Sequence, residues 1–222
     1  MTPNPWSHTA LDTFKNCPRQ FHAKYVLKNV KEPPSPALAW GREVHTAFEN
    51  RMKTGAPVPA NMVQHAAYLT LLEARPGEGH TEQKIALNKQ ARPCGFFAGD
   101  VWYRGAIDYM KIDGETALII DYKTGKPHQK NEQLLTFALH TFIAHPQVMT
   151  VDGRYYWTQT GQESGKAWVR ADVPAMWASL VPDLKQYAEA FRTDIWQPRQ
   201  SGLCRAWCPV FSCEFNGRSG YD

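Results

Sequence analysis

The sequence predicts an α/β domain with a central mixed β-sheet flanked by helices. Two strand-like segments meet at Asp113-Gly114, a dipeptide typical of tight hairpin turns. The second segment opens with the apolar run 117–120 (ALII), as expected of a strand buried on both faces. Apolar residues recur at helical spacing in 38–52 and 131–144. Helices therefore precede and follow the hairpin, which favours a layered α/β fold.

The remaining elements follow from capping and turn signals. Ser7 is expected to cap a first short helix, and Cys17-Pro18 to begin a second. Pro182 lies inside a helical stripe and predicts a kink or a break there. The other expected elements are a linker at 31–36, a helix at 61–74, a loop at 76–79, a strand at 82–87, a last core strand at 154–160 and a helix at 176–191.

The length of 222 residues permits one domain with a sizeable core, or one core with a satellite, and we expect a single domain, 1–222. Hydrophobic residues make up 43% and charged residues 21%, and no apolar run is long enough to cross a bilayer, so we expect no membrane partner. The N-terminus lacks the pattern of a secretion signal, which favours the cytoplasm of a bacterium or of a phage-infected host. The net charge of +4 permits a nucleic-acid partner without demanding one.

The polarity changes directly after the apolar run, at Asp121-Tyr122-Lys123. Side chains alternate along a strand, so Asp121 and Lys123 share one side and Tyr122 faces away. The hairpin brings Asp108 of the first strand close to Asp121. Two neighbouring carboxylates are stable together mainly with a cation between them, and a lysine beside that cation can orient a water molecule. This pattern indicates metal-assisted phosphodiester hydrolysis, with a surface ion pair as the alternative.

The order of these motifs resembles a known family. Residues 105–108 (GAID) and 120–125 (IDYKTG) resemble the PD-(D/E)XK nuclease superfamily, in particular RecB-like exonucleases and CRISPR-adaptation nucleases. The resemblance runs from Cys17 to Cys213. It implies a restriction-endonuclease-like core and a divalent-metal-dependent DNA nuclease, most consistent with an exonuclease in recombination, repair or phage DNA processing. DNA is then the substrate, and a recombination or helicase protein the expected partner.

The resemblance also assigns metal ligands. In the family, a G-x-x-x-H helix supplies a histidine, and Gly41 and His45 match that motif. A glutamate opens the strand before the G-x-x-D strand, and Glu82 matches by position. A solvent-facing histidine and an ordinary exposed glutamate are the alternatives. The ion implied is Mg²⁺ or Mn²⁺, held by His45, Glu82, Asp108, Asp121 and the backbone carbonyl of Tyr122.

The catalytic assignment adds Lys123 and Gln133 to the two aspartates, Asp108 and Asp121. Lys123 is expected to orient the attacking water and Gln133 to help place the substrate. Family members carry Q-x-x-x-Y on this helix, whereas here the tyrosine position is Phe137, so the ring is kept and the hydroxyl is lost. With 8 Trp, 9 Tyr and 10 Phe, a few exposed rings could stack on bases.

Three cysteines, Cys204, Cys208 and Cys213, are crowded near the C-terminus as C-x3-C-x4-C. They could surround one metal centre with Cys17 as the fourth ligand, because four thiolates commonly hold an iron–sulfur cluster or zinc. Ordinary reduced cysteines are the alternative. Cys94 stands apart and is expected to be a free thiol.

The resembling nucleases include members with one N-terminal and three C-terminal cysteines around a [4Fe-4S] cluster. That likeness implies a clasp that joins residues 1–30 and 195–222, with zinc as the alternative cofactor. The usual spacing there is C-x2-C-x5-C, and this chain shifts the middle cysteine by one place.

Two other function classes stay open. One is a catalytically silent nuclease-like module that binds DNA or a protein, against which the retained Asp108, Asp121 and Lys123 argue. The other is a metal-dependent hydrolase of a different phosphate ester.

Overall fold

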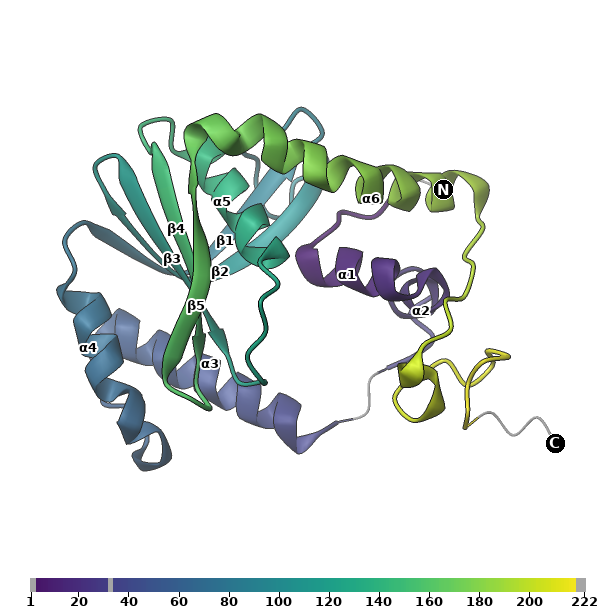
Figure 1. Cartoon of the computed structure of the whole chain (residues 1–222), viewed down its shortest axis with the longest axis horizontal. Helices are drawn as coiled ribbons and strands as arrows, with labels where there is room; N and C mark the ends of the chain where they lie inside the picture. Colours follow the sequence, from purple (N-terminus) through teal and green to yellow (C-terminus); the bar gives the residue numbers. More distant parts are fainter. Residues whose placement is uncertain (1–2, 32–33, 219–222) are drawn as a thin grey trace. The chain divides into compact units, whose positions relative to one another are not determined.

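The computed structural model describes residues 3–31 and 34–218. The chain forms two compact units, both drawn in Figure 1. The sheet unit comprises Ser35–Met176, and the terminal unit comprises Met1–Pro34 together with Trp177–Asp222. That 1–222 forms one domain stays a prediction. Part of the predicted linker, Glu32 and Pro33, lies outside the described residues.

The sheet unit contains five strands in the order β1-β2-β3-β4-β5. Neighbouring strands are antiparallel except β3 and β4, which are parallel, so the predicted mixed sheet is confirmed. The parallel pair needs a crossover, and helix α5 supplies it. The strands are β1 (Glu78–Asn88), β2 (Val101–Asp113), β3 (Thr116–Lys123), β4 (Thr150–Trp157) and β5 (Gln162–Val169).

The predicted hairpin joins β2 to β3. Asp113 pairs with Thr116, which leaves Gly114 and Glu115 as the two loop residues. Gly114 has φ 54°, a left-handed conformation that glycine adopts without steric cost. Residues 117–120 are buried, so the prediction of a strand covered on both faces is confirmed.

Helices cover both faces of the sheet (Figure 1). On one face, Val44 of α3 (Pro36–Thr54) and Leu69 of α4 (Ala66–Ala74) pack in a buried cluster with Ile120 of β3. On the other face lies α5 (Glu132–Ala144), whose Leu134 sits against Gly153: a Cβ at Gly153 would lie 3.2 Å from Leu134 Cβ. The expectation of a sheet flanked by helices is therefore confirmed.

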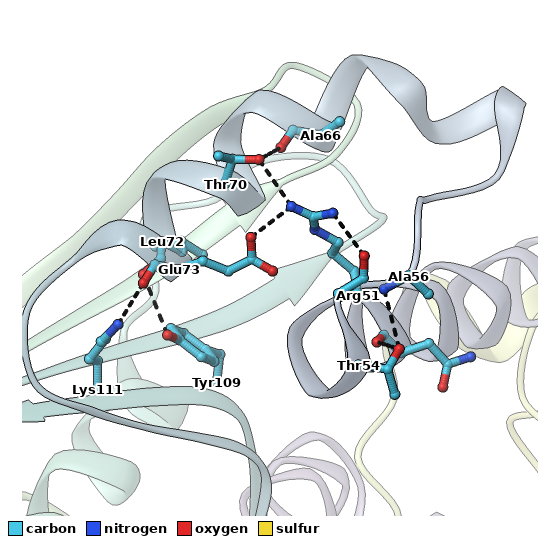
Figure 2. Close-up of polar contacts among 11 residues, drawn as sticks. Arg51, Thr54, Ala56, Ala66, Thr70, Leu72, Glu73, Tyr109 and Lys111 are labelled. Atoms are coloured by element: carbon cyan, nitrogen blue, oxygen red, sulfur yellow. Dashed lines mark hydrogen bonds and ion pairs between the residues drawn. The ribbon is translucent and has the colours of Figure 1, made fainter.

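Arg51 ties α3 to α4 (Figure 2). Its guanidinium donates to Glu73 Oε2 at 2.7 Å and to Thr70 Oγ1 at 3.2 Å. The end of α4 is also held to β2, because Lys111 Nζ donates to the Glu73 carbonyl at 2.8 Å and the Tyr109 hydroxyl to the Leu72 carbonyl at 3.4 Å. These contacts fix α3, the helix that carries His45, relative to the sheet.

The terminal unit is built on aromatic packing. Ser7 caps its first helix as predicted, with its hydroxyl accepting from Ala10 N. Phe14 and Phe21 pack edge to face, with ring centroids 5.7 Å apart. Of the kink or break predicted at Pro182, the break is wrong, since helix α6 (Val173–Thr193) runs through this residue, and the kink stays a prediction. The helices of the terminal unit are α1 (His8–Asn16), α2 (Pro18–Phe21), the π-helix η1 (His22–Val26), most of α6 and the 3-10 helix η4 (Gly202–Arg205).

Several predicted boundaries differ from the structure. β1 begins at Glu78, inside the predicted loop 76–79, because pairing with β2 extends to Ile112. The predicted helix 61–74 starts as a 3-10 helix, η2 (Ala60–His65). β4 is not the last strand, because β5 pairs with it; the 3-10 turn η3 (Arg170–Asp172) follows β5. Among the described helices, none combines the length and apolar character that a bilayer-spanning segment requires.

Candidate active site

Three predicted ligands converge from three elements: His45 from α3, Glu82 from β1 and Asp108 from β2. One ligand atom from each lies within 4.8 Å of the other two. His45 Nδ1 is 3.2 Å from Asp108 Oδ1. Gly41, one turn before His45, lets α3 approach the end of β3, because a Cβ there would lie 3.3 Å from Thr124 Oγ1.

The β1–β2 ladder is interrupted at the two carboxylate residues that it contributes to the site, Glu82 and Asp108. Pairing skips Glu82 and Asp108, although the register is the same on both sides of them. Glu82 has φ 51°, a left-handed conformation that a non-glycine residue adopts at an energetic cost. Strained backbone of this kind is concentrated at functional sites, where the rest of the fold holds it in place.

Asp108 also links β2 to β3 where the two strands separate. Their pairing ends at Tyr109 and Ile120, and beyond it the Tyr122 amide donates to Asp108 Oδ2 at 2.8 Å. The Tyr122 ring lies in the core next to Phe48, on the face of β3 opposite to Asp121 and Lys123. The predicted alternation of side chains is therefore confirmed, and metal binding by the Tyr122 carbonyl stays a prediction.

Asp121 and Lys123 lie on one side of β3, as predicted. Lys123 Nζ is 2.5 Å from Asp121 Oδ2, and Gln133 of α5 bridges both side chains. The Gln133 amide donates to Asp121 Oδ1 at 2.9 Å, and its oxygen accepts from Lys123 Nζ at 2.8 Å. Gln133 thus fixes the pair, and its predicted role in placing the substrate stays a prediction. Lys123 Nζ also lies over the Tyr155 ring, 5.3 Å from its centroid.

The Asp121 carboxyl is held where ionisation is costly. Burial raises its pKa to about 6, the positive charge of Lys123 opposes this, and the negative charge of Asp108 adds to it. The buried Oδ2 atom makes no hydrogen bond of acceptable geometry, despite its short contact with Lys123. An oxygen in this position can still accept a ligand bond.

Burial and neighbouring carboxylates also shift the pKa values of Glu82 and His45. Burial raises the pKa of Glu82, and the charges of Asp108 and Glu49 raise it further. Burial lowers the pKa of His45, but its hydrogen bond to Asp108 and the charges of Asp108 and Asp121 outweigh this, so the net shift is upward. A divalent cation would relieve this repulsion, and carboxylate oxygens with one imidazole nitrogen suit Mg²⁺ or Mn²⁺. The residues therefore fit the predicted ion.

Two residues of the site were missed from the sequence. Glu49 lies one turn after His45 on α3, so the i,i+4 spacing could have placed it near the cluster. Tyr155 lies under Lys123 because β3 and β4 pair in parallel register, with Asp121 opposite Tyr155. No sequence signal specifies that register.

The cysteines of the terminal unit form a second candidate site, and all five cysteines of the chain are free. Cys17 Sγ accepts from the Arg199 amide at 3.5 Å, and Cys204 Sγ accepts from the Ser201 amide at 3.4 Å. Burial raises the pKa of the Cys208 thiol, and its proximity to Cys204 and Cys17 raises it further.

The two ends of the chain pack together within the terminal unit. Arg19 of α2 forms an ion pair with Glu214 at 3.3 Å, and Cys213 is buried in a cluster with Ala23 and Val210. Within the ranges 3–31 and 34–218, no three thiols lie close enough to share one ion. The metal clasp of residues 1–30 and 195–222 stays a prediction. Cys94 belongs to the sheet unit, in the connection between β1 and β2.

The sequence matches the model of the PD-(D/E)XK nuclease superfamily over residues 5–213. The crystal structure of SSO0001 has a TM-score of 0.50 at 15% identity, covering 97% of this chain and 88% of that one. The crystal structure of a "Putative exonuclease" from Eubacterium rectale has a TM-score of 0.52 at 12% identity, covering 90% and 85%. None of the curated proteins has a matching sequence. At these identities the two structures show the fold alone, and the predicted fold class is confirmed.

Proposed function

Because the chain belongs to the PD-(D/E)XK nuclease superfamily, we propose that it is a divalent-metal-dependent deoxyribonuclease that acts as an exonuclease. The observation that carries this proposal is the convergence of His45, Glu82 and Asp108 beside the buried Asp121–Lys123 pair. Buried like charges at the end of a sheet lower stability, so their presence favours a chemical use.

The metal would be held by His45, Glu82, Asp108 and Asp121, with the Tyr122 carbonyl as a further ligand. When bound, a divalent ion supplies a more acidic water and offsets negative charge on the phosphate. The imidazole nitrogen of His45 favours Mn²⁺ over Mg²⁺, because manganese accepts nitrogen ligands more readily.

Lys123 and Gln133 would act on the substrate side of the site. The Lys123 ammonium donates to Gln133 Oε1 and forms an ion pair with Asp121 Oδ2, so a further proton of the ammonium can point to a water or a phosphate oxygen. A cation fixed in advance stabilises charge that develops in the transition state without a cost of reorganisation. Gln133 would position both side chains as well as the DNA strand.

The exonuclease assignment rests on the resemblance of residues 105–108 and 120–125 to RecB-like nucleases. The Eubacterium rectale structure, which carries the word exonuclease in its name, supports the same assignment. A role in DNA recombination, repair or phage DNA processing follows, and a helicase or recombination protein would supply any unwinding.

The cysteines would hold a [4Fe-4S] cluster, with zinc as the alternative. Backbone amides that donate to the sulfurs of Cys17 and Cys204 support this, because such contacts stabilise thiolates that carry charge. The cluster would be structural, since hydrolysis needs no redox step. Iron, sulfide and zinc analysis of protein purified without oxygen tests the choice, and folded, active protein with neither metal would exclude both.

One digestion series tests the nuclease. Single- and double-stranded DNA labelled at each end is incubated with Mg²⁺, Mn²⁺ or EDTA, and the products are resolved by length. We expect metal-dependent shortening from an end, with mononucleotides or short oligonucleotides released. Asp108→Ala serves as the inactive control and Asp113→Ala, on the exposed hairpin turn, as the active one. Metal-independent cleavage, or full activity in Asp108→Ala, would reject the proposal.

A further inference from the structure

An exposed aromatic ring, Phe97, lies in the connection between β1 and β2. The residue is 79% exposed, and its ring packs edge to face against the half-buried Phe96, with centroids 5.1 Å apart. The loop is anchored beneath them, because the Cys94 amide donates to the Ala86 carbonyl at 3.2 Å. An aromatic ring held in solvent by an anchored loop offers a flat surface for stacking.

Two cations lie against these rings. Lys84 Nζ is 5.7 Å from the Phe96 centroid and 5.9 Å from that of Phe97. The corresponding distances from Arg104 Cζ are 5.4 and 5.8 Å. Arg104 pairs with Ala86, two residues from Lys84, so both cations project from the same face of the β1–β2 hairpin.

The positive charge of this cluster is not neutralised by the protein. Across the part of the chain that the structure describes, neither Lys84 nor Arg104 has a carboxylate within 4.0 Å, and the buried Nε of Arg104 has no hydrogen-bond partner. Arg154 on β4 shows the contrast, since it forms ion pairs with both Asp152 and Glu163. The first two cations are therefore available to an anion.

The same face of the hairpin leads to the metal ligands. Tyr103, next to Arg104, faces Thr136 of α5, so Arg104 projects toward the opposite side, where α3 brings His45 to Asp108. Asp108 lies four positions after Arg104 along β2, a distance of about 13 Å at 3.3 Å per residue. Ala106 lies between them on the same face and is exposed.

We propose that this face binds an unpaired DNA strand and leads it to the metal site. Lys84 and Arg104 would bind phosphates, and a base would stack on Phe97. Stacking platforms flanked by basic residues are how proteins hold single strands, whereas bases in a duplex already stack on one another. The inference rests on the proposed nuclease function, and it names single-stranded DNA as the form that reaches the site.

Binding without metal tests the stacking platform. The affinity of the full-length protein for a fluorescein-labelled oligothymidylate is measured by anisotropy in EDTA, beside a blunt duplex of equal length. We expect Phe97→Ala to weaken single-strand binding about tenfold and Phe97→Trp to preserve it. Duplex affinity should change less than about twofold in either variant, because the duplex offers no free base face. Leu71→Ala, at a 68% exposed position of α4, is the matched control and should leave both affinities unchanged.

The salt dependence tests the two cations. Lys84→Ala and Arg104→Ala should each lower the slope of log affinity against log salt by about 0.7, the value for one phosphate contact on a single strand. Lys166→Ala is the control: its ammonium also lies over a ring, 5.9 Å from the Trp168 centroid, but on β5 at the opposite edge of the sheet.

The inference fails if Phe97→Ala binds single strands as the wild type does, or if its duplex affinity falls equally. Because the assay contains no metal, these outcomes are separate from the nuclease test. DNA cleavage with an unchanged Phe97→Ala affinity would reject this inference and keep the nuclease. Loss of single-strand binding in Phe97→Ala, in a protein that cleaves no DNA, would reject the nuclease and keep the binding face.

Discussion

The sheet unit and the terminal unit hold their candidate sites in opposite ways. In the sheet unit, Asp108 and Asp121 lie on long strands whose positions are fixed by a continuous core. In the terminal unit, Cys204, Cys208 and Cys213 lie on a segment whose one regular element is the short helix η4. The acidic site is therefore positioned by regular secondary structure and a buried core, whereas the segment that carries the three cysteines contains little secondary structure.

This difference sets what each unit gains from a bound metal. The segment 197–218 leaves Leu203, Trp207 and Phe211 more than half exposed and buries few residues. The small apolar surface that this segment buries does not offset the conformational entropy lost when the segment is ordered. The free energy of metal binding would supply the missing stabilisation. In the sheet unit, a metal would instead offset the electrostatic cost of its own ligands.

The largest expected effect separates activity from stability in the sheet unit. Asp121→Asn should lower DNA cleavage at least about 1,000-fold, because it removes a charged ligand. The pKa of Asp121 is about 6 in the folded chain, above its ordinary value, so at pH 8 the ionised group opposes folding. Without metal at pH 8, Asp121→Asn should therefore be more stable than the wild type by about 1 kcal/mol, measured by urea unfolding.

The wild type with saturating Mn²⁺ is the matched comparison, since the ion should remove that advantage. An Asp121→Asn variant that is less stable than the wild type without metal would show that the carboxylate supports the fold.

The terminal unit should respond in the opposite sense. If the proposed clasp is present, Cys17→Ser should lower its melting temperature by about 10 °C, because losing one of four ligands would release the metal and leave the tail less ordered. Cys94→Ser should leave the transition unchanged. Calorimetry combined with iron and zinc analysis measures both; equal melting of the two variants would contradict the clasp.

An effect of about tenfold is expected from pH. The pKa of Asp121 is raised to about 6, and the pKa values of Glu82 and His45 are also raised, so protons compete with metal more strongly as the pH falls. Mn²⁺ affinity, measured by calorimetric titration, should fall about tenfold from pH 7.5 to 5.5. A separate titration of metal binding by the cysteines shows whether the metal affinity of the terminal unit also depends on pH. A flat profile for Mn²⁺ would argue against these three ligands.

The smallest effect concerns the support of α3. Arg51→Ala should destabilise the sheet unit by about 1 kcal/mol, since it removes partly buried hydrogen bonds to Glu73 and Thr70 (Figure 2). Arg192→Ala, which breaks the fully exposed pair with Glu189 on α6, should have no measurable effect. Equal effects of the two substitutions would mean that the Arg51 contacts do not hold α3.

The hairpin and the order of the site motifs could be predicted because they depend on local chemistry. Asp113-Gly114 favours a tight turn, and the alternation after Ile120 fixes which side chains share a face. The sequence could not show that Glu82 lies in the middle of a strand in a left-handed conformation, because that follows from pairing with β2.

Non-local packing accounts for the other differences. The helix through Pro182 continues because a proline removes one hydrogen bond, which the packing around Leu180 and Tyr187 can offset. Gln133 was placed from its motif, but its bridge between Asp121 and Lys123 depends on how α5 crosses the sheet. Tyr155 depends on the parallel register of β3 and β4, which no turn specifies.

The single parallel pair also has a consequence for the order of folding. β1, β2 and β3 are neighbours in both sequence and space, so Glu82, Asp108 and Asp121 can be brought together by two hairpins, with connections 89–100 and 114–115. The β3–β4 ladder must wait until the whole of α5 has crossed the sheet, which closes a longer loop. We therefore expect the acidic cluster to form before Gln133 supports it, so that repulsion among its carboxylates would raise the folding barrier.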